Sequence, residues 1–328
     1  MNDQDLERLL KSAGPRERPP PEVEHAVHAQ LHAEWSAMLQ SNRGRRHRRG
    51  AFALAAGLLA AAVGLWIAAS GTGAPPAAVG TLAVVTGDVR ERAGWLSGWR
   101  QMDGGDVVLA GRTLETGAGA RAAMALPGGM SVRIDQGSRV ALVGADALRI
   151  ERGTIYVDSG PGVARRVQLR IETPAGTVRH VGTQYELRLL QTGVQLRVRE
   201  GRVEFRSPDG AVEQGQTGEQ LVIFGDGRVE RATTLLHGPS WDWVADAAPA
   251  IDLEGMTLSR FLGWAGRELG REVTYDAALT SADLASVVVH GSTTGLTPGE
   301  ALHAVLATTS FRADVVGGRI VIARRDPA

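Results

Sequence analysis

Residues Ile171 to Ser207 read IETPAGTVRHVGTQYELRLLQTGVQLRVREGRVEFRS. Apolar and polar residues alternate here in short runs, which is the pattern of strands with one buried face. Similar runs recur over residues 79–245, separated by glycine-bearing turns. Pro208–Gly210 and Gly225–Gly227 have the composition of hairpin turns. The sequence predicts a mainly β region of many short antiparallel strands, and a stacked sheet, a sandwich and a solenoid would all fit.

The pattern of apolar and polar residues changes at about residue 246. Residues 246–325 predict a small α+β domain with helices against one sheet. After a short strand at Ile251–Leu253, Thr257 is expected to cap a helix that ends at Gly270. The apolar face of this helix consists of Leu258, Phe261, Leu262, Ala265 and Leu269. Spacing of this kind indicates a helix that packs against a sheet.

A second helix follows in the same segment. Thr297, Pro298 and Glu300 have the spacing of a capping box with proline in the first turn. Two more strands and a closing hairpin are expected at Glu272–Tyr275, at Val287–Val289 and around Gly317–Gly318.

The charge-free stretch Ala51–Ala69 predicts a single membrane span. Its length of about 19 residues gives roughly 29 Å of helix, which matches the hydrocarbon core of a bilayer. The residues that precede it are strongly basic: Arg43, Arg45, Arg46, Arg48 and Arg49. By the positive-inside rule, the N-terminus is cytoplasmic and the C-terminal bulk is exported through a linker over residues 70–78.

This stretch has two alternative interpretations. A cleaved signal peptide would have its processing site near Ala68–Gly71, but the long polar segment ahead of the span favours a retained anchor. A buried core helix is disfavoured because no polar residue makes the stretch amphipathic.

The cytoplasmic segment, residues 1–50, has one organised element. Apolar side chains recur there at about four-residue spacing, as along one face of a helix. They are Val23, Val27, Leu31, Trp35 and Leu39. So short a segment buries little apolar surface alone, which favours a binding face for a partner over a loosely folded pair of helices. His28 and His32 have a spacing that suits zinc, yet without cysteine or a third ligand they predict a solvated face and no metal site.

The composition excludes several classes of function. The chain has no cysteine, and its single lysine is Lys11, which excludes thiol chemistry and a lysine-based site in the exported part. Acidic and basic residues balance at 36 each, which gives no reason to expect direct nucleic-acid binding. No catalytic constellation stands out, so we expect a protein that is not an enzyme and needs no cofactor.

The central stretch closely resembles the signature of FecR-type periplasmic domains, in which a TPxG turn leads into a GTx[FY] strand and a VxxGxV hairpin. The matching residues are Thr173, Pro174, Gly176, Val178, Gly182, Thr183, Tyr185, Gly201 and Val203. The C-terminal segment resembles the STN module of secretins and TonB-dependent transducers. Together with the predicted span, this is the layout of a FecR-type sigma regulator.

The resemblance implies an inner-membrane regulator of cell-surface signalling, a function commonly linked to iron uptake. Such a protein would bind an extracytoplasmic-function sigma factor in the cytoplasm and the STN domain of a TonB-dependent outer-membrane transporter in the periplasm. Regulatory proteases would transmit the signal and so change transcription. The apolar stripe around Trp35 is our candidate for the sigma-factor contact. The alternative is a membrane-anchored periplasmic scaffold or binding module without a transcriptional role.

Two finer expectations concern particular segments. Some FecR relatives cleave themselves at a Gly-Thr bond, which corresponds here to Gly182 and Thr183, with His180 nearby. We favour instead a glycine turn that feeds a strand in which Thr183 pairs across the sheet. In the C-terminal domain, either Arg312–Val316 or Arg319–Ala323 is expected to be an edge strand that adds a partner's strand.

Overall fold

The structure, a computed structural model, describes residues 76–94, 96–160, 169–277 and 279–325. All described residues lie in one compact unit, Pro75–Ala328. The predicted cytoplasmic segment, the membrane span and most of the linker therefore lie outside the described residues. Among the helices in the described ranges, none has the length and apolar character needed to cross a membrane.

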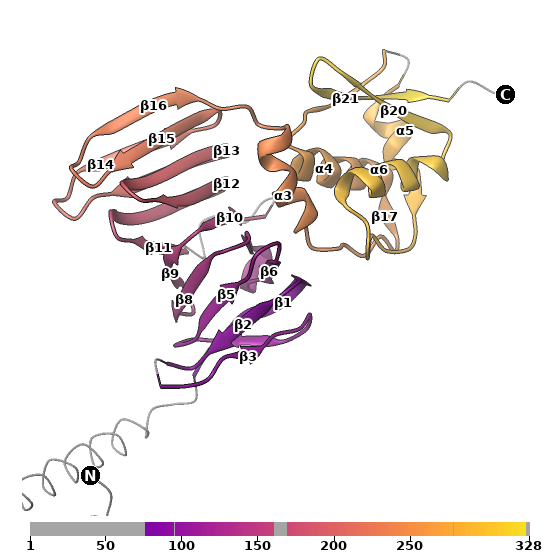
Figure 1. Cartoon of the computed structure of the whole chain (residues 1–328). Coiled ribbons are helices and arrows are strands. Elements are labelled where there is room, and N and C mark those ends of the chain that lie inside the picture. The colour runs from indigo at the N-terminus through magenta and orange to yellow at the C-terminus, as the bar shows by residue number, and fades with distance from the viewer. Residues whose placement is uncertain (1–75, 95, 161–168, 278, 326–328) are drawn as a thin grey trace, which may run out of the picture. The chain divides into compact units, whose positions relative to one another are not determined.

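Sixteen strands form one large sheet in the first part of this unit (Figure 1). The strands before the signature are β1 (Ala78–Thr86), β2 (Val89–Arg92), β3 (Arg100–Gln101), β4 (Val107–Leu109), β5 (Thr113–Thr116), β6 (Arg121–Ala125), β7 (Ser131–Ile134), β8 (Arg139–Gly144), β9 (Ala147–Arg152) and β10 (Thr154–Asp158). The strands from the signature onward are β11 (Arg170–Thr173), β12 (Gly176–Leu190), β13 (Gly193–Arg206), β14 (Val212–Gln216), β15 (Glu219–Phe224) and β16 (Val229–Thr233). A short 3-10 helix, η1 (Pro127–Gly129), joins β6 to β7.

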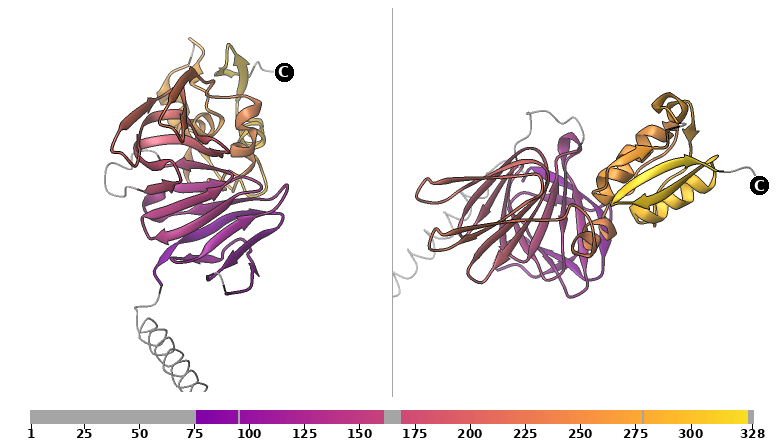
Figure 2. Two further views of the ribbon diagram at one scale, coloured as in Figure 1. Left: turned by 60° about the vertical axis from the view of Figure 1, so that its left-hand side comes forward. Right: turned by 90° about the horizontal axis from the view of Figure 1, so that it is seen from above.

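The sheet curls around a single apolar core (Figure 2). Its main path runs β3-β2-β5-β8-β9-β11-β12-β10-β7-β6-β1-β4, and β13 to β16 continue from β12. Alternate residues of nearly every strand point into this core, among them Leu82, Ile134, Val157 and Leu196, all fully buried. Burial of such side chains stabilises the fold by about 1.5–3 kcal/mol each.

The C-terminal part of the unit has its own apolar core and two small sheets. Its elements are η2 (Pro239–Trp241), α3 (Asp242–Asp246), β17 (Met256–Thr257), α4 (Leu258–Leu269), β18 (Val273–Tyr275), α5 (Ser281–Ala285), β19 (Val288–Val289), α6 (Pro298–Ala307), β20 (Phe311–Val316) and β21 (Arg319–Arg324). β17 pairs with β19, while β21 lies between β18 and β20. The predicted face of α4 lies in this core, where Phe261, Leu262 and Ala265 are fully buried.

Locally encoded features match the sequence predictions. Thr257 caps α4 by accepting a hydrogen bond from the backbone N–H of Arg260, and Gly270 ends the helix in the left-handed conformation. Thr297 and Glu300 form the predicted capping box of α6. The predicted hairpin turns join β13 to β14, β15 to β16 and β20 to β21.

Other expectations were wrong. β12 and β13 have 15 and 14 residues, so the strands are not all short, and β9 pairs with β11 in parallel. Ile251–Leu253 forms only an isolated bridge at Asp252, and the helices α3 and α5 were not expected. Of the two proposed edge strands, Arg319–Ala323 lies in the middle of its sheet, so β20 is the edge of the pair. These features depend on which distant segments pair with each other, and the local sequence pattern does not predict such pairing.

Candidate functional site at the corner of two long strands

The signature begins with a tight turn between β11 and β12. The Thr173 hydroxyl accepts hydrogen bonds from the backbone N–H groups of Ala175 and Gly176, at 3.2 and 3.1 Å. It donates to the carbonyl of Gly176 at 2.9 Å, and Pro174 lies within the turn. The TPxG sequence thus fixes the start of β12 through one side chain.

β12 and β13 each turn a corner in mid-strand, at the signature glycines. The first half of β12 pairs with β11 and the second half with β10. The first half of β13 pairs with β15 and the second with β14. The register between the two strands shifts between Val181 and Gln184, where the pairing moves from Arg202 to Glu200. Strands that pass from one layer to another use such bulges.

The corner reverses which alternate residues face the core. Val178 and Tyr185 both point inward although their spacing is odd, and Val203 and Val198 do the same on β13. Gly201, at the bulge of β13, has φ of 82°, a conformation that favours glycine. The prediction of a hairpin at Gly201 was therefore wrong, because this glycine bends a continuous strand.

Thr183 lies at the corner and is fully buried. Its backbone N–H donates to the Ser159 hydroxyl at 2.7 Å, and its carbonyl accepts from the Ser159 N–H at 3.0 Å. Its own hydroxyl has no hydrogen-bond partner among the described residues. The predicted glycine turn at Gly182 is a bulge within β12.

A row of three polar residues crosses the sheet beside Thr183. Asp158 on β10 pairs with Gln184 on β12, which pairs with Glu200 on β13. The Gln184 amide donates to Asp158 Oδ2 at 2.9 Å. The guanidinium of Arg267, on α4, forms ion pairs with both carboxylates of the row. One side chain of the C-terminal region therefore bridges the two ends of the row.

The charged groups at this row shift one another's pKa values. Burial alone would raise the pKa of the Asp158 carboxyl, but the hydrogen bond and charge of Arg267 hold that pKa below its usual value. Burial would likewise lower the pKa of Arg267, and the carboxylates of Asp158 and Glu200 raise it instead. Both groups of the central pair are ionised at neutral pH.

A second ion pair joins β7 to the C-terminal region and is buried on both sides. Arg133 is 1% exposed and pairs with Glu268 of α4, which is 5% exposed, at 2.9 Å. The same guanidinium donates to the carbonyl of Val244 in α3 at 2.7 Å and lies over the ring of Tyr156. It thus holds two helices against the outer face of the sheet.

Aromatic residues of η2 and α3 complete the contact. Tyr156 packs edge-on against Trp241 and Trp243, with ring centroids 6.1 and 6.5 Å apart. The Trp243 indole N–H donates to Glu186 at 3.0 Å, and Glu186 also receives both arms of the Arg197 guanidinium. Such charge-assisted pairs combine strength with geometric specificity.

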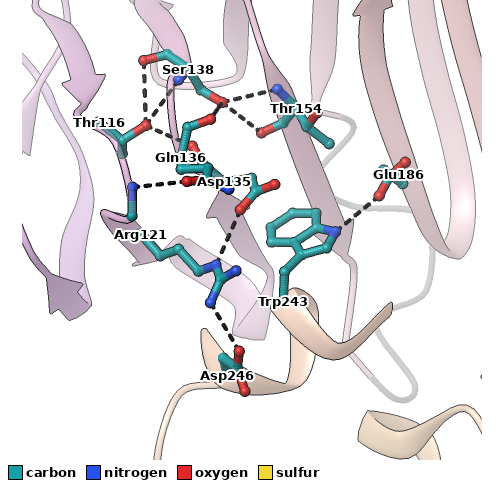
Figure 3. A network of polar contacts seen from close by, with 10 residues as sticks. Thr116, Arg121, Asp135, Gln136, Ser138, Thr154, Glu186, Trp243 and Asp246 are labelled. Carbon is teal, nitrogen blue, oxygen red and sulfur yellow. Dashed lines mark hydrogen bonds and ion pairs between the residues drawn. The ribbon is translucent and has the colours of Figure 1, made fainter. Parts of the chain in front are cut away.

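Figure 3 shows this contact beside an internal polar network of the sheet. Arg121 donates to Asp135 on the sheet at 3.1 Å and to Asp246 at the end of α3 at 2.9 Å. In the same network, the Ser138 hydroxyl accepts a hydrogen bond from the backbone N–H of Thr154 at 2.9 Å. The network connects the strands of the sheet to α3.

A cavity of about 620 Å³ lies next to the two ion pairs. Its polar wall includes Arg133, Asp158 and Glu268, and its apolar wall includes Met130 and Trp264. No group of side chains suited to hold a metal ion occurs in the described ranges. The outer face is thus joined to α4 by specific charged contacts around a cavity whose wall is partly apolar.

The structure gathers some of the predicted residues and leaves others apart. The signature residues from Thr173 to Val203 all lie on β11, β12 and β13 or the turn between them. The stripe around Trp35 and the basic cluster from Arg43 to Arg49 lie outside the described residues. Sequence patterns did not single out Arg133, Asp158, Glu186 and Arg197, because charges that alternate along a strand usually indicate a solvated face. They did not single out Arg267 on the helix α4 either. The closely spaced Trp241 and Trp243 were the available signal for a covered surface.

Comparison with known proteins matches the middle part of the sheet to a family model. Residues 112–204, from just before β5 to the second half of β13, match the family model described as FecR protein. The chain therefore contains a FecR domain, and the FecR-type resemblance predicted from the sequence is confirmed. The matched segment includes the corner at Thr183 and Gly201.

Two solved structures also resemble the chain. Both are described as a “putative anti-sigma factor from Parabacteroides distasonis ATCC 8503”, at 2.50 and 1.65 Å resolution. Each shares 16% identity over 65% of this chain and 99% of its own length, with TM-scores of 0.35 and 0.34. No curated protein matches the chain.

Proposed function

We propose that this protein is a FecR-type regulator that controls an extracytoplasmic-function sigma factor from the inner membrane. The observation that carries the proposal is the FecR domain at residues 112–204. The sequence supports it with a predicted span at Ala51–Ala69 and a basic flank that orients the N-terminus toward the cytoplasm. A receptor half and a cytoplasmic segment on opposite sides of one span suit communication across the membrane. The protein acts in this proposal as a regulator and not as an enzyme.

The sigma factor binds the stripe that contains Val27, Leu31 and Trp35. A short segment with an uncovered apolar face gains most of its stability from the partner that covers it. The signal leaves the periplasm through regulated proteolysis, which frees this segment from the membrane.

The C-terminal region receives the signal from the STN domain of a TonB-dependent outer-membrane transporter. Its resemblance to an STN module suggests this partner, and β20 is the candidate contact. β20 is an edge strand, and Val315 and Val316 are 63% and 61% exposed. An exposed edge offers unpaired backbone groups to which a partner strand can pair. Deleting residues 246–328 is expected to abolish the transporter contact, and retained contact would refute this part of the proposal.

Affinity capture of the full chain from its native cell tests the sigma-factor contact. The chain carries an N-terminal tag, and the captured proteins are identified by mass spectrometry. We expect a sigma factor to be captured by the wild-type chain and lost with Trp35→Asp, which puts a charge in the stripe. His25→Asp, on the flank of the same predicted helix, should leave capture unchanged. Capture of envelope proteins alone would contradict regulation and favour the scaffold.

A further inference from the structure

One guanidinium of α4 spans three neighbouring strands at the corner of the sheet. Asp158, Gln184 and Glu200 form a paired row on β10, β12 and β13, and the pairing of β12 with β13 shifts register on either side of it. Arg267 forms an ion pair with each end of this row, and Gln184 is bonded to Asp158 in its middle. The side chain of Arg267 is 15% exposed and that of Asp158 is 9% exposed. The central pair is therefore shielded from water and weakly screened by salt.

The row is connected directly to the peptide between Gly182 and Thr183. Ser159 follows Asp158, and its hydroxyl accepts from the Thr183 N–H at 2.7 Å. The Ser159 N–H donates to the Thr183 carbonyl at 3.0 Å, and Asp158 holds the amide of Gln184, the residue after Thr183. Asp158, the last residue of β10, and Ser159, which follows it, thus hold Thr183 and Gln184, the two residues after Gly182. A displacement of Asp158 must loosen the hydrogen bonds of Thr183.

The contact between α4 and the sheet is of a kind that can open. Beside the Tyr156 aromatic cluster, the contact consists of ion pairs and hydrogen bonds around the cavity of about 620 Å³, whose wall also contains apolar side chains such as Met130 and Trp264. Buried ion pairs repay little more than their own desolvation, so they hold one geometry and contribute little net stability. Interfaces of this polar kind between regions of one chain open more readily than an apolar core.

We propose that α4 is a releasable latch on the corner of β12. While Arg267 bridges Asp158 and Glu200, the peptide at Gly182–Thr183 is held closed. When a partner draws the C-terminal region away, the row separates, Ser159 loses its contacts with Thr183, and the corner opens to solvent. The proposal rests on the proposed function only for the identity of that partner, a protein strand on β20.

Backbone hydrogen exchange of the full chain in mild detergent tests the latch. Arg267→Met keeps the length of the side chain and removes its charge. Exchange in the peptides that cover residues 155–160 and 183–190 is expected to become about tenfold faster, because local opening sets the rate there. Exchange in β1 and β6 should stay as in the wild type.

Matched variants separate the latch from a general loss of stability. Arg260→Met makes the same change at an exposed arginine of α4 that borders the same cavity but has no ion pair in the described structure, and it should leave the corner unchanged. Asp158→Asn should reproduce the effect of Arg267→Met, and Arg267→Lys should restore part of the protection. Faster exchange in α4 without any change at 183–190 would overturn the proposal, as would equal acceleration in β1 and β6. No sigma factor takes part, so a negative result here leaves the proposed function standing.

Discussion

The two faces of β10, β12 and β13 differ sharply in composition. The inward face carries Val157, Leu187 and Leu196, all fully buried in the core of the sheet. The outward face carries Asp158, Glu186 and Arg197, which are almost as deeply buried, against η2, α3 and α4. The same strands thus support a permanent core on one side and a charged contact on the other. Burial of a side chain alone therefore does not show whether the contact that it makes is permanent.

The energetics of the two faces differ for a physical reason. An apolar side chain gains from leaving water whatever its neighbour, so the inward face tolerates small movements. An ion pair gains only while its partner is in place, and a separated buried charge costs several kcal/mol. Separation therefore requires that the outward charges return to water together, as they do when α4 leaves as one piece.

The largest expected effect comes from damage to the inward face. Phe205→Ala, which removes a fully buried ring of the core, should lower the free energy of unfolding by about 3–5 kcal/mol. Urea unfolding followed by tryptophan fluorescence measures the loss. A loss below about 1 kcal/mol would mean that the sheet does not depend on this core.

On the outward face, a single substitution should destabilise the protein more than a matched double substitution does. Arg133→Met alone leaves Glu268 charged and buried and should destabilise the docked state by about 3 kcal/mol. The double variant Arg133→Met with Glu268→Leu should recover most of that loss. Thermal unfolding of both variants makes the comparison, and additive losses would contradict a charge-dependent contact.

A smaller effect tests the close approach at the end of α4. Gly270 has φ of 62°, and an added Cβ would lie 2.0 Å from the Leu236 carbonyl oxygen. Gly270→Ala should cost about 1–2 kcal/mol from the left-handed conformation alone, and the steric clash adds to it. Gly263→Ala in the same helix meets no atom within 4 Å and should be neutral or stabilising by up to about 1 kcal/mol. Equal effects of the two variants in a thermal melt would argue against this packing.

The smallest expected effect is on the pH dependence. The pKa of Asp158 is lower in the folded protein than its ordinary value, so its stabilising contribution is complete above the ordinary carboxyl range. That contribution should be lost as the pH falls through the lowered pKa. Wild type and Asp158→Asn should therefore differ in stability at neutral pH and converge in acid. Parallel curves down to about pH 2 would show that the carboxylate charge is immaterial.

The sequence predicted what neighbouring residues determine. The caps at Thr257 and Thr297 and the hairpin turns follow from spacing over a few positions, and the structure confirms them. The FecR signature also identified the right strands. Gly201 was misplaced because a glycine between alternating runs fits a turn as well as a bulge, and only the pairing partner decides.

The candidate site was beyond reach of the sequence for the same reason. Arg267 and Asp158 are 109 positions apart, and nothing near either residue shows that they meet. A charged residue at an outward strand position is usually solvated, so Glu186 and Arg197 gave no sign of burial. Long-range packing of α3 and α4 onto the sheet created the site, and it leaves no periodic trace in the sequence.

The transcript profile of the native cell tests the central proposal, that this protein with a FecR domain regulates a sigma factor. Cells that carry the wild-type chain are compared with cells that carry Trp35→Asp, with His25→Asp as the matched control. The account predicts that one group of genes with a shared promoter type changes several-fold with Trp35→Asp and not with His25→Asp. Identical profiles in all three strains, with equal amounts of the protein in each, would contradict it.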